Sequence, residues 1–142
     1  MSHWEAILRW ITKYNIKSIL DAPCGSGSDH GAFRQAGVER ILGIDLVASE
    51  GPDFLRADLT VFHPDRDWDT VYINCIFCSN VVGKGDHAAL AKNYASWPVR
   101  YILLYDTPGF NRETHFLEAG WRKLEDEDDG QGHGSRQQMW GK

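Results

Sequence analysis

The sequence predicts an α/β protein built on a mostly parallel, seven-stranded sheet, and two features of the chain predict it. Short apolar segments of strand length alternate with amphipathic segments of helix length along most of the chain. Such alternation indicates βαβ units, in which right-handed helical crossovers join parallel strands. The last two strand-like segments follow one another without a helix between them, which predicts an antiparallel hairpin at one sheet edge.

The individual elements are placed by apolar spacing and by the residues that end them. In the first helix Trp4, Ile7, Leu8, Ile11 and Tyr14 recur at helical spacing, which gives a face that can cover one edge of the sheet. The expected helices cover residues 3–15, 29–36, 86–96 (with Asp86 as N-cap) and 111–119. The expected strands cover residues 17–20, 40–46, 53–58, 70–77, 100–106, 121–125 and 136–140, with an acidic, glycine-rich turn between the last two. No repeat or linker interrupts this order, so residues 1–142 are expected to form a single domain.

Composition narrows the class of protein. The chain is 42% hydrophobic and 25% charged, which is typical of a globular protein. Its apolar runs are far shorter than the roughly 20 residues of a membrane-spanning helix, and its start has no export signal, so we expect a soluble, cytoplasmic protein. The formal net charge is −5, and residues 125–129 are all acidic. Without a basic stripe to grip phosphates, nucleic acid is not favoured as a partner.

The three cysteines do not predict a metal centre. Cys24, Cys75 and Cys78 are an odd number, and reduced thiols fit the chain better than a disulfide framework. Cys75-x-x-Cys78 has the spacing of a zinc half-site, but a zinc ion needs about four ligands and the remaining cysteine lies in a glycine-rich turn. We therefore expect no metal.

Acidic residues end three successive predicted strands. The first strand ends at Asp21 and is followed by a turn that contains Gly25 and Gly27, where the backbone can approach a ligand closely. The second strand carries Asp45 near its end, and the third ends at Asp58. In open parallel sheets ligands bind beyond the carboxyl ends of the strands, at the point where the strand order reverses. Three acids in this arrangement indicate a nucleoside-like ligand.

At these residues the chain resembles the class I S-adenosylmethionine-dependent methyltransferases. Residues 19–27, Ile-Leu-Asp-Ala-Pro-Cys-Gly-Ser-Gly, look like the glycine-rich first motif of that family. Ile44-Asp45 resembles its acidic residue after the second strand, Ala57-Asp58-Leu59 its adenine motif, and residues 68–74 its fourth strand. The resemblance covers nearly the whole chain. It implies a three-layer Rossmann-like sandwich whose last strand is inserted antiparallel.

The resemblance also implies a cofactor, S-adenosyl-L-methionine, and roles for single residues. Asp21 would face the ammonium group of the cofactor, directly or through water, and Gly25 and Gly27 would pass under its methionine part. Asp45 would bind the ribose and Asp58 the adenine amino group. The full set of implied cofactor-binding residues is Asp21, Pro23, Gly25, Gly27, Asp45, Leu46, Asp58, Leu59 and Asn74. One departure is Pro23, which stands where many members have the first glycine and which has no N–H to donate.

A dinucleotide-binding Rossmann domain is the competing interpretation, since it also places an acid at the end of the second strand. Its fingerprint is G-x-G-x-x-G, whereas His30 stands in the third glycine position here and Gly31 comes one residue late. A carboxylate at Asp21 would also face a pyrophosphate with the wrong charge. Both observations favour a cationic ligand group over a pyrophosphate.

Methyl transfer from a sulfonium is an in-line displacement, so positioning is the main demand on the protein. Asn74 would face the sulfonium and the acceptor, and an oxygen or amine acceptor needs a base within hydrogen-bond reach. The candidate bases are His30, Asp106 and His87, each of which could instead have a structural role. The candidate catalytic set is therefore Asn74, Asp106 and His30.

The methyl acceptor is left open by the sequence. The fourth strand continues as Asn74-Cys75-Ile76-Phe77 and lacks the Asn-Pro-Pro-Tyr run that resembles amine methylases of DNA bases. The chain has no insertion that could enclose a small acceptor, so either a partner subunit closes the site, as in a homodimer, or a large acceptor docks on an open face. Trp121 and Trp140 are the candidates for an exposed aromatic wall that such a partner could meet, although core packing is the favoured interpretation of both. A non-catalytic cofactor-binding or interaction protein on the same fold is the alternative function.

Overall fold

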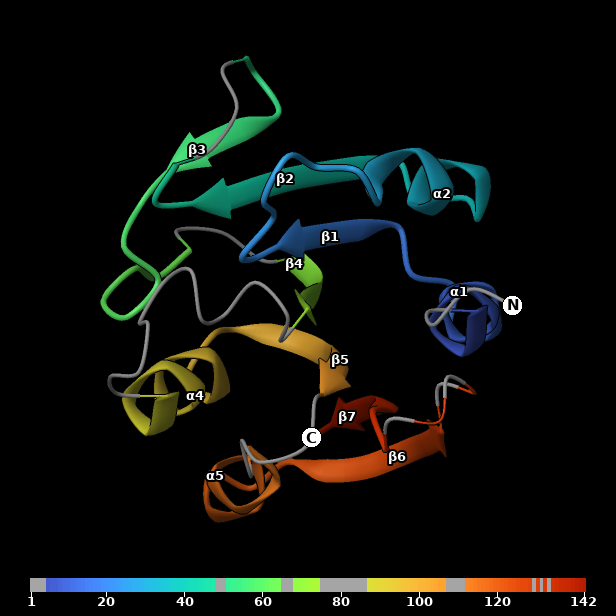
Figure 1. The fold of residues 1–142 in the computed structure, drawn as a ribbon, viewed down its shortest axis with the longest axis vertical. Helices are drawn as coiled ribbons and strands as arrows, with labels where there is room; N and C mark the ends of the chain where they lie inside the picture. The colour runs from blue at the N-terminus through green and yellow to red at the C-terminus, as the bar shows by residue number, and fades with distance from the viewer. Residues whose placement is uncertain are drawn as a thin grey trace.

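Figure 1 shows the computed structural model of the chain, which describes residues 5–47, 51–64, 68–74, 87–106, 112–128, 130, 132 and 134–142. The helices are α1 (Glu5–Lys13), α2 (His30–Gln35), α4 (His87–Ala95) and α5 (Glu113–Glu118). The strands are β1 (Ser18–Asp21), β2 (Arg40–Asp45), β3 (Phe54–Arg56), β4 (Trp68–Asn74), β5 (Val99–Asp106), β6 (Arg122–Asp128) and β7 (Arg136–Gly141). Their order along the chain confirms the predicted order, although β3 is shorter than the predicted 53–58.

The strands form one seven-stranded sheet in the order β3-β2-β1-β4-β5-β7-β6. Strands β1 to β5 pair in parallel, whereas β7 pairs antiparallel with both β5 and β6. This arrangement confirms the predicted mostly parallel sheet with an antiparallel hairpin at one edge. The order reverses between β1 and β4, so the crevice where ligands bind such sheets lies beyond the carboxyl ends of these two strands.

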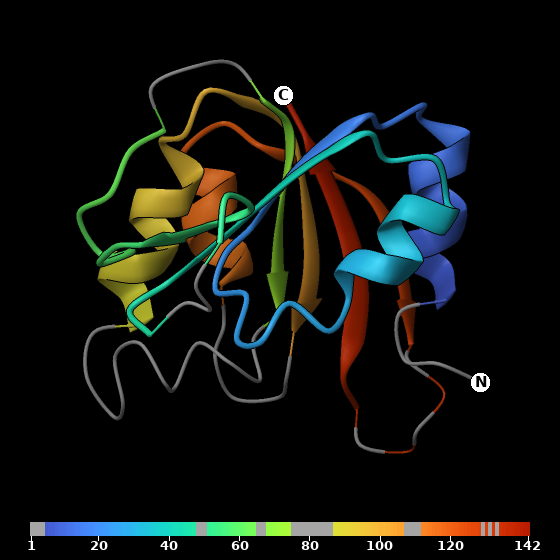
Figure 2. The same ribbon diagram turned by 90° about the horizontal axis from the view of Figure 1, so that it is seen from above.

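Helices cover both faces of the sheet and complete a three-layer α/β sandwich (Figure 2). On one face α1 and α2 pack their apolar residues, among them Ile7, Trp10 and Phe33, against the sheet. On the other face α4 and α5 do the same, with Tyr94 and Phe116 among their buried residues. Successive residues of a strand point to opposite faces, so the register of each strand decides which side chains meet the ligand crevice.

The first helix lies over the hairpin side of the sheet, as its apolar spacing predicts. Ile7 and Ile11 are fully buried, and the backbone N–H of Ile7 donates a hydrogen bond to Gln137 Oε1 in β7 at 3.2 Å. Trp10 is also buried. The helix therefore presents a wider apolar face than the predicted spacing indicates.

The acidic run was predicted to leave the strand after Glu125 and form a turn, and this is wrong for residues 126–128, which also belong to strand β6. Four adjacent acids can form an edge strand because cations face most of them. Three ion pairs provide this compensation: Arg9–Glu127 at 2.7 Å, Lys13–Glu125 at 2.6 Å and Arg136–Asp126 at 2.8 Å. Residue 129 lies outside the described residues. Charged side chains on an edge strand also discourage pairing with another chain.

Core packing, the favoured interpretation of the two hairpin tryptophans, is confirmed, and the alternative of an exposed aromatic wall is wrong. Trp121 and Trp140 are almost completely buried and belong to the core between the sheet and helices α4 and α5. Their indole N–H groups are satisfied inside the protein, by the Ala95 carbonyl at 2.9 Å and by Gln138 Oε1 at 3.1 Å. Burial of an indole ring stabilises the core as long as its N–H has a hydrogen-bond partner. Both rings meet this condition, so both are buried.

Several predictions fall on residues outside the described ranges: the N-cap Asp86, the end of the fourth predicted strand at 75–77, and Cys75 and Cys78. In the part of the chain that is described, no helix is long and apolar enough to cross a membrane.

Candidate functional site

The candidate site is built at the carboxyl ends of β1, β2 and β4, on the face of the sheet that α2 covers. In the register of the sheet Asp21 pairs with Gly43 of β2 and with Tyr72 of β4. Asp45 and Asn74 lie two residues beyond these partners, and alternate residues of a strand point to the same face. The fold therefore brings together Asp21, Asp45 and Asn74, as the sequence predicts, and all three side chains are buried.

The glycine-rich turn after β1 is tied directly to Asp45. The backbone N–H of Gly25 donates to Asp45 Oδ2 at 2.9 Å, and the N–H of Leu46 donates to Oδ1 of the same carboxylate at 2.7 Å. Gly25 and Gly27 have φ values of 55° and 77°, in the left-handed region that favours glycine. Each carboxylate oxygen can accept more than one hydrogen bond, so Asp45 holds the turn in place and keeps capacity for a further donor.

Two more residues shape this turn. The peptide bond between Ala22 and Pro23 is cis. Cys24 is buried, its Sγ lies close to the Cα of Gly43, and burial raises the pKa of its thiol to about 12. Cys24 is therefore a thiol that packs under the turn, as the expectation of reduced cysteines requires.

Asp21 is paired inside the protein with His30, the first residue of α2. His30 Nε2 lies 2.8 Å from Asp21 Oδ2, and the side chains are only 11% and 3% exposed. Burial raises the pKa of the Asp21 carboxyl to about 6, although the contact with His30 acts in the opposite direction. The His30 ring also stacks on Phe54, with 5.4 Å between ring centroids and 15° between planes.

A buried hydroxyl lies beside this pair. Tyr72 is fully buried, and the side chains of Asp29 and Asn74 lie beside its OH. Burial, together with the nearby carboxylates of Asp29 and Asp21, raises the pKa of this phenol well above its ordinary value. The hydroxyl is therefore neutral and adds an uncharged polar group to the site.

The third predicted acid has a structural role in the ligand-free protein. Asp58 is exposed, and its Oδ1 accepts hydrogen bonds from the backbone N–H and the hydroxyl of Thr60, at 2.9 and 2.6 Å. These bonds lower the pKa of the Asp58 carboxyl. The Leu59 side chain is buried in the core, and its carbonyl accepts a hydrogen bond from Asn93 at 2.7 Å. Asp58 thus caps its own turn, and its adenine contact stays a prediction.

On the other side of the crevice, two candidate bases are tied to a buried arginine. Arg112 Nη1 donates to Asp106 Oδ1 at 2.8 Å, and Arg112 Nη2 lies 3.4 Å from His87 Nδ1. The Arg112 side chain is only 1% exposed. Sequence reasoning missed this residue, since a single arginine before a predicted helix carries no periodic or motif signal. The one available signal was indirect: an acid such as Asp106 that becomes partly buried at a strand end needs a cationic partner.

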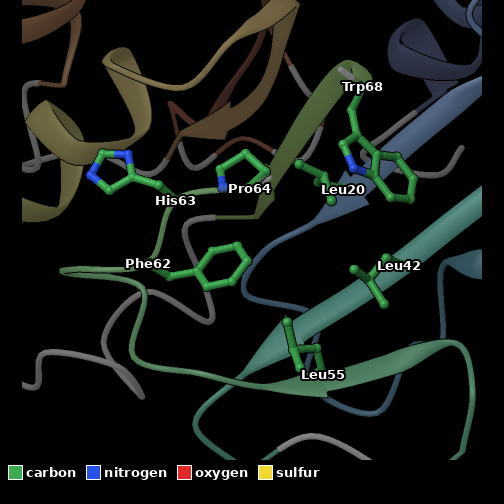
Figure 3. Close-up of a pocket in the computed structure, with 7 residues that line it drawn as sticks. All are labelled: Leu20, Leu42, Leu55, Phe62, His63, Pro64 and Trp68. Carbon is green, nitrogen blue, oxygen red and sulfur yellow. The ribbon is translucent and has the colours of Figure 1, made fainter. Parts of the chain in front are cut away.

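An apolar cavity of about 190 Å³ lies away from this site, on the face that α4 and α5 cover (Figure 3). Aliphatic side chains of β1, β2 and β3 line it from one side, and a histidine, an aromatic and a proline ring come from the segment that follows β3. Since Leu20 and Leu42 point to the face opposite Asp21 and Gly43, the cavity does not open onto the candidate site. Its residues are Leu20, Leu42, Leu55, Phe62, His63, Pro64 and Trp68.

Comparison with solved structures identifies the fold of the chain. No protein-family model matches the chain, and a search of curated proteins finds no match. Solved structures do match it in shape. A TehB-like S-adenosylmethionine-dependent methyltransferase from Corynebacterium glutamicum has a TM-score of 0.67 at 16% identity, over 95% of this chain and 86% of its own. Magnesium protoporphyrin IX methyltransferase from Synechocystis, solved with bound S-adenosylmethionine, has a TM-score of 0.68 at 15% identity, over 97% and 77%.

A putative RNA methyltransferase from Pyrococcus horikoshii has a TM-score of 0.68 at 14% identity, over 96% of this chain and 81% of its own. The chain has the class I methyltransferase fold. At identities this low the comparison establishes the fold and leaves the chemistry to be argued from the site. In open α/β sheets in general, ligands bind beyond the carboxyl ends of the strands, and Asp21, Asp45 and Asn74 gather at those ends here.

Proposed function

We propose that this chain binds S-adenosylmethionine and transfers its methyl group to an acceptor by in-line displacement. The observation that carries the proposal is the hydrogen bond from Gly25 N–H to Asp45 Oδ2 at 2.9 Å. It joins the glycine-rich turn to the acid of the neighbouring strand, so the two elements that a nucleoside-bearing ligand needs form one unit. The structural neighbours named above are methyltransferases, and one of them was solved with this cofactor.

The residues present fit such a cofactor. A carboxylate at Asp21 suits an ammonium group, and His30 contacts it through Oδ2. The neutral hydroxyl of Tyr72 lies close to the same carboxylate. Asp45 can accept further bonds from the hydroxyls of a ribose. When bound, the cofactor would supply an electrophilic methyl group on a positively charged sulfur.

In this proposal Asp21 holds the amino-acid end of the cofactor and Asp45 its ribose. Asn74 lies at the end of β4, between these acids and Asp106 of β5, since it pairs with Tyr105 in the sheet. It therefore stands where the methyl group and the acceptor would meet, and its role is to orient them. Pro23, Gly25, Gly27, Leu46, Asp58 and Leu59 complete the proposed cofactor site.

The geometry also favours one alternative, a protein that binds the cofactor without turning it over. Each candidate base is already engaged: His30 by Asp21, and both Asp106 and His87 by Arg112. A paired base can still act once substrate binds, because catalytic hydrogen bonds often change on binding. Turnover decides between the two functions.

Calorimetry with S-adenosylmethionine and S-adenosylhomocysteine tests binding. Asp45→Ala should weaken binding by about 1.5–3 kcal/mol, the loss of charge-assisted hydrogen bonds. Asp45→Asn keeps the shape of the side chain and should weaken it less. Asp53→Asn is the matched control, since Asp53 is an exposed acid just before β3. No binding by the unaltered protein, or equal affinity for all four proteins, would remove the proposed site.

Incubation with cofactor carrying a labelled methyl group, together with pools of small molecules, proteins and RNA, tests turnover. Appearance of label in an acceptor supports a methyltransferase, and tight binding without transfer to any pool supports the alternative. The acceptor, a homodimer and the cytoplasmic location remain predictions of the sequence.

A further inference from the structure

The pair formed by Asp21 and His30 lies among acidic and neutral groups from every element around it. Asp29 and Cys24 come from the turn before α2, Asp45 from β2, and Tyr72 and Asn74 from β4. Among the described residues, His30 is the one basic side chain in contact with the Asp21 carboxylate. The carboxylates of Asp29 and Asp45 raise the pKa of Asp21, which favours a proton on the pair.

His30 is held in its place by packing. Its ring stacks on Phe54, and it also lies against Gly27, where an added Cβ would come within 3.2 Å of His30 Cε1. Swinging the ring away from Asp21 would give up both contacts. When a second cation reaches Asp21, the pair therefore responds by losing a proton more readily than by moving the ring.

We propose that a ligand ammonium group that binds at Asp21 displaces the proton shared by Asp21 and His30, which couples cofactor binding to pH, with His30 as the positioning residue whose Nε2 holds the Asp21 carboxylate. This inference rests on the proposed function. Without ligand, and below about pH 6, the pair carries one proton more than a carboxylate beside a neutral imidazole. On binding, that proton passes to the buffer, the ammonium takes over its positive charge, and neutral His30 still donates Nε2–H to Asp21 Oδ2.

The direction of the pH effect follows from linkage. Ligand and proton compete for the same carboxylate, so affinity is highest where the pair has already lost its proton and falls as the pH is lowered. Burial raises the pKa of Asp21 to about 6, which puts this change near pH 6. The α-amino group of the ligand has an ordinary pKa of about 7.7 and is mostly protonated at pH 7 and below. The affinity should therefore fall about tenfold between pH 7 and pH 5.

Calorimetry with S-adenosylhomocysteine in two buffers of different ionisation enthalpy measures the protons released on binding. The expected result is close to one proton at pH 5 and close to none at pH 7. Methylthioadenosine lacks the ammonium group, so its binding should release no proton at either pH. This comparison of two ligands needs no variant.

Asp21→Asn keeps the shape of the side chain but cannot titrate, so it should bind S-adenosylhomocysteine more weakly, without proton release and with a flat pH profile. His30→Gln removes a contact that lowers the pKa of Asp21, so proton release should persist in this variant and extend to higher pH. His63→Gln, which changes an exposed histidine of the apolar cavity, should behave like the unaltered protein. Binding by the unaltered protein without proton release, or release that persists in Asp21→Asn, overturns this inference alone. Failure of both ligands to bind at any pH overturns the proposed function and this inference with it.

Discussion

Replacing Gly27 by alanine tests whether the glycine-rich turn is shaped by its neighbours as the structure indicates. A Cβ at this position would lie 2.8 Å from two ring carbons of Phe54, closer than real Cβ contacts, and 3.2 Å from His30. The residue also has a φ of 77°, where an alanine costs about 1–2 kcal/mol. The two contacting carbons lie at the far end of the Phe54 side chain, which can shift. The steric clash should therefore add only about 1 kcal/mol to the cost of the substitution. Gly27→Ala should therefore lower the free energy of unfolding by about 2–3 kcal/mol.

Urea denaturation followed by tryptophan fluorescence measures this change. The matched control is Gly31→Ala, four residues away in α2, where an added Cβ meets nothing within 4 Å. Since alanine favours helix more than glycine does, this variant should be more stable by about 0.5–1 kcal/mol. In Phe54→Leu the ring carbons are gone, so Gly27→Ala on that background should cost only the backbone part. Equal stability of Gly27→Ala and the unaltered protein would refute this account of the turn.

Three further predictions concern buried polar groups. Arg112→Leu should lower the free energy of unfolding by about 3 kcal/mol, because it leaves the Asp106 carboxylate without its cation, and the double variant with Asp106→Leu should recover most of the loss; additive losses in denaturation would contradict this coupling. Trp121→Phe should cost about 1–2 kcal/mol, since the Ala95 carbonyl loses its donor, and a cost near zero would show that water replaces the indole. A carboxyl whose pKa rises on folding, like that of Asp21, gives stability that is complete below its unfolded pKa and is lost as the pH rises through its folded pKa of about 6. The stability advantage of the unaltered protein over Asp21→Asn should accordingly shrink by about 2–3 kcal/mol between pH 4 and pH 7, and a constant difference would contradict the shift.

The fold was readable from the chain because local signals agreed with one another. Strand-length apolar runs, breakers between them and amphipathic helices are local properties, and their order specified the parallel sheet and its terminal hairpin. Asp21 and Asp45 could likewise be placed at strand ends, since the end of a strand is visible in its sequence. The pairing of strands then brought them together as predicted.

The sequence by itself determined which residues lie at the carboxyl ends of the strands, and so where a ligand can bind. Only the tertiary structure decided what those residues touch. It joined Asp21 to His30 and Asp106 to Arg112, and it buried Trp121. Hydrogen bonds and burial form between segments far apart in the chain, and no periodicity or spacing encodes them, so the protonation of the site and its partners could emerge only once the chain had packed.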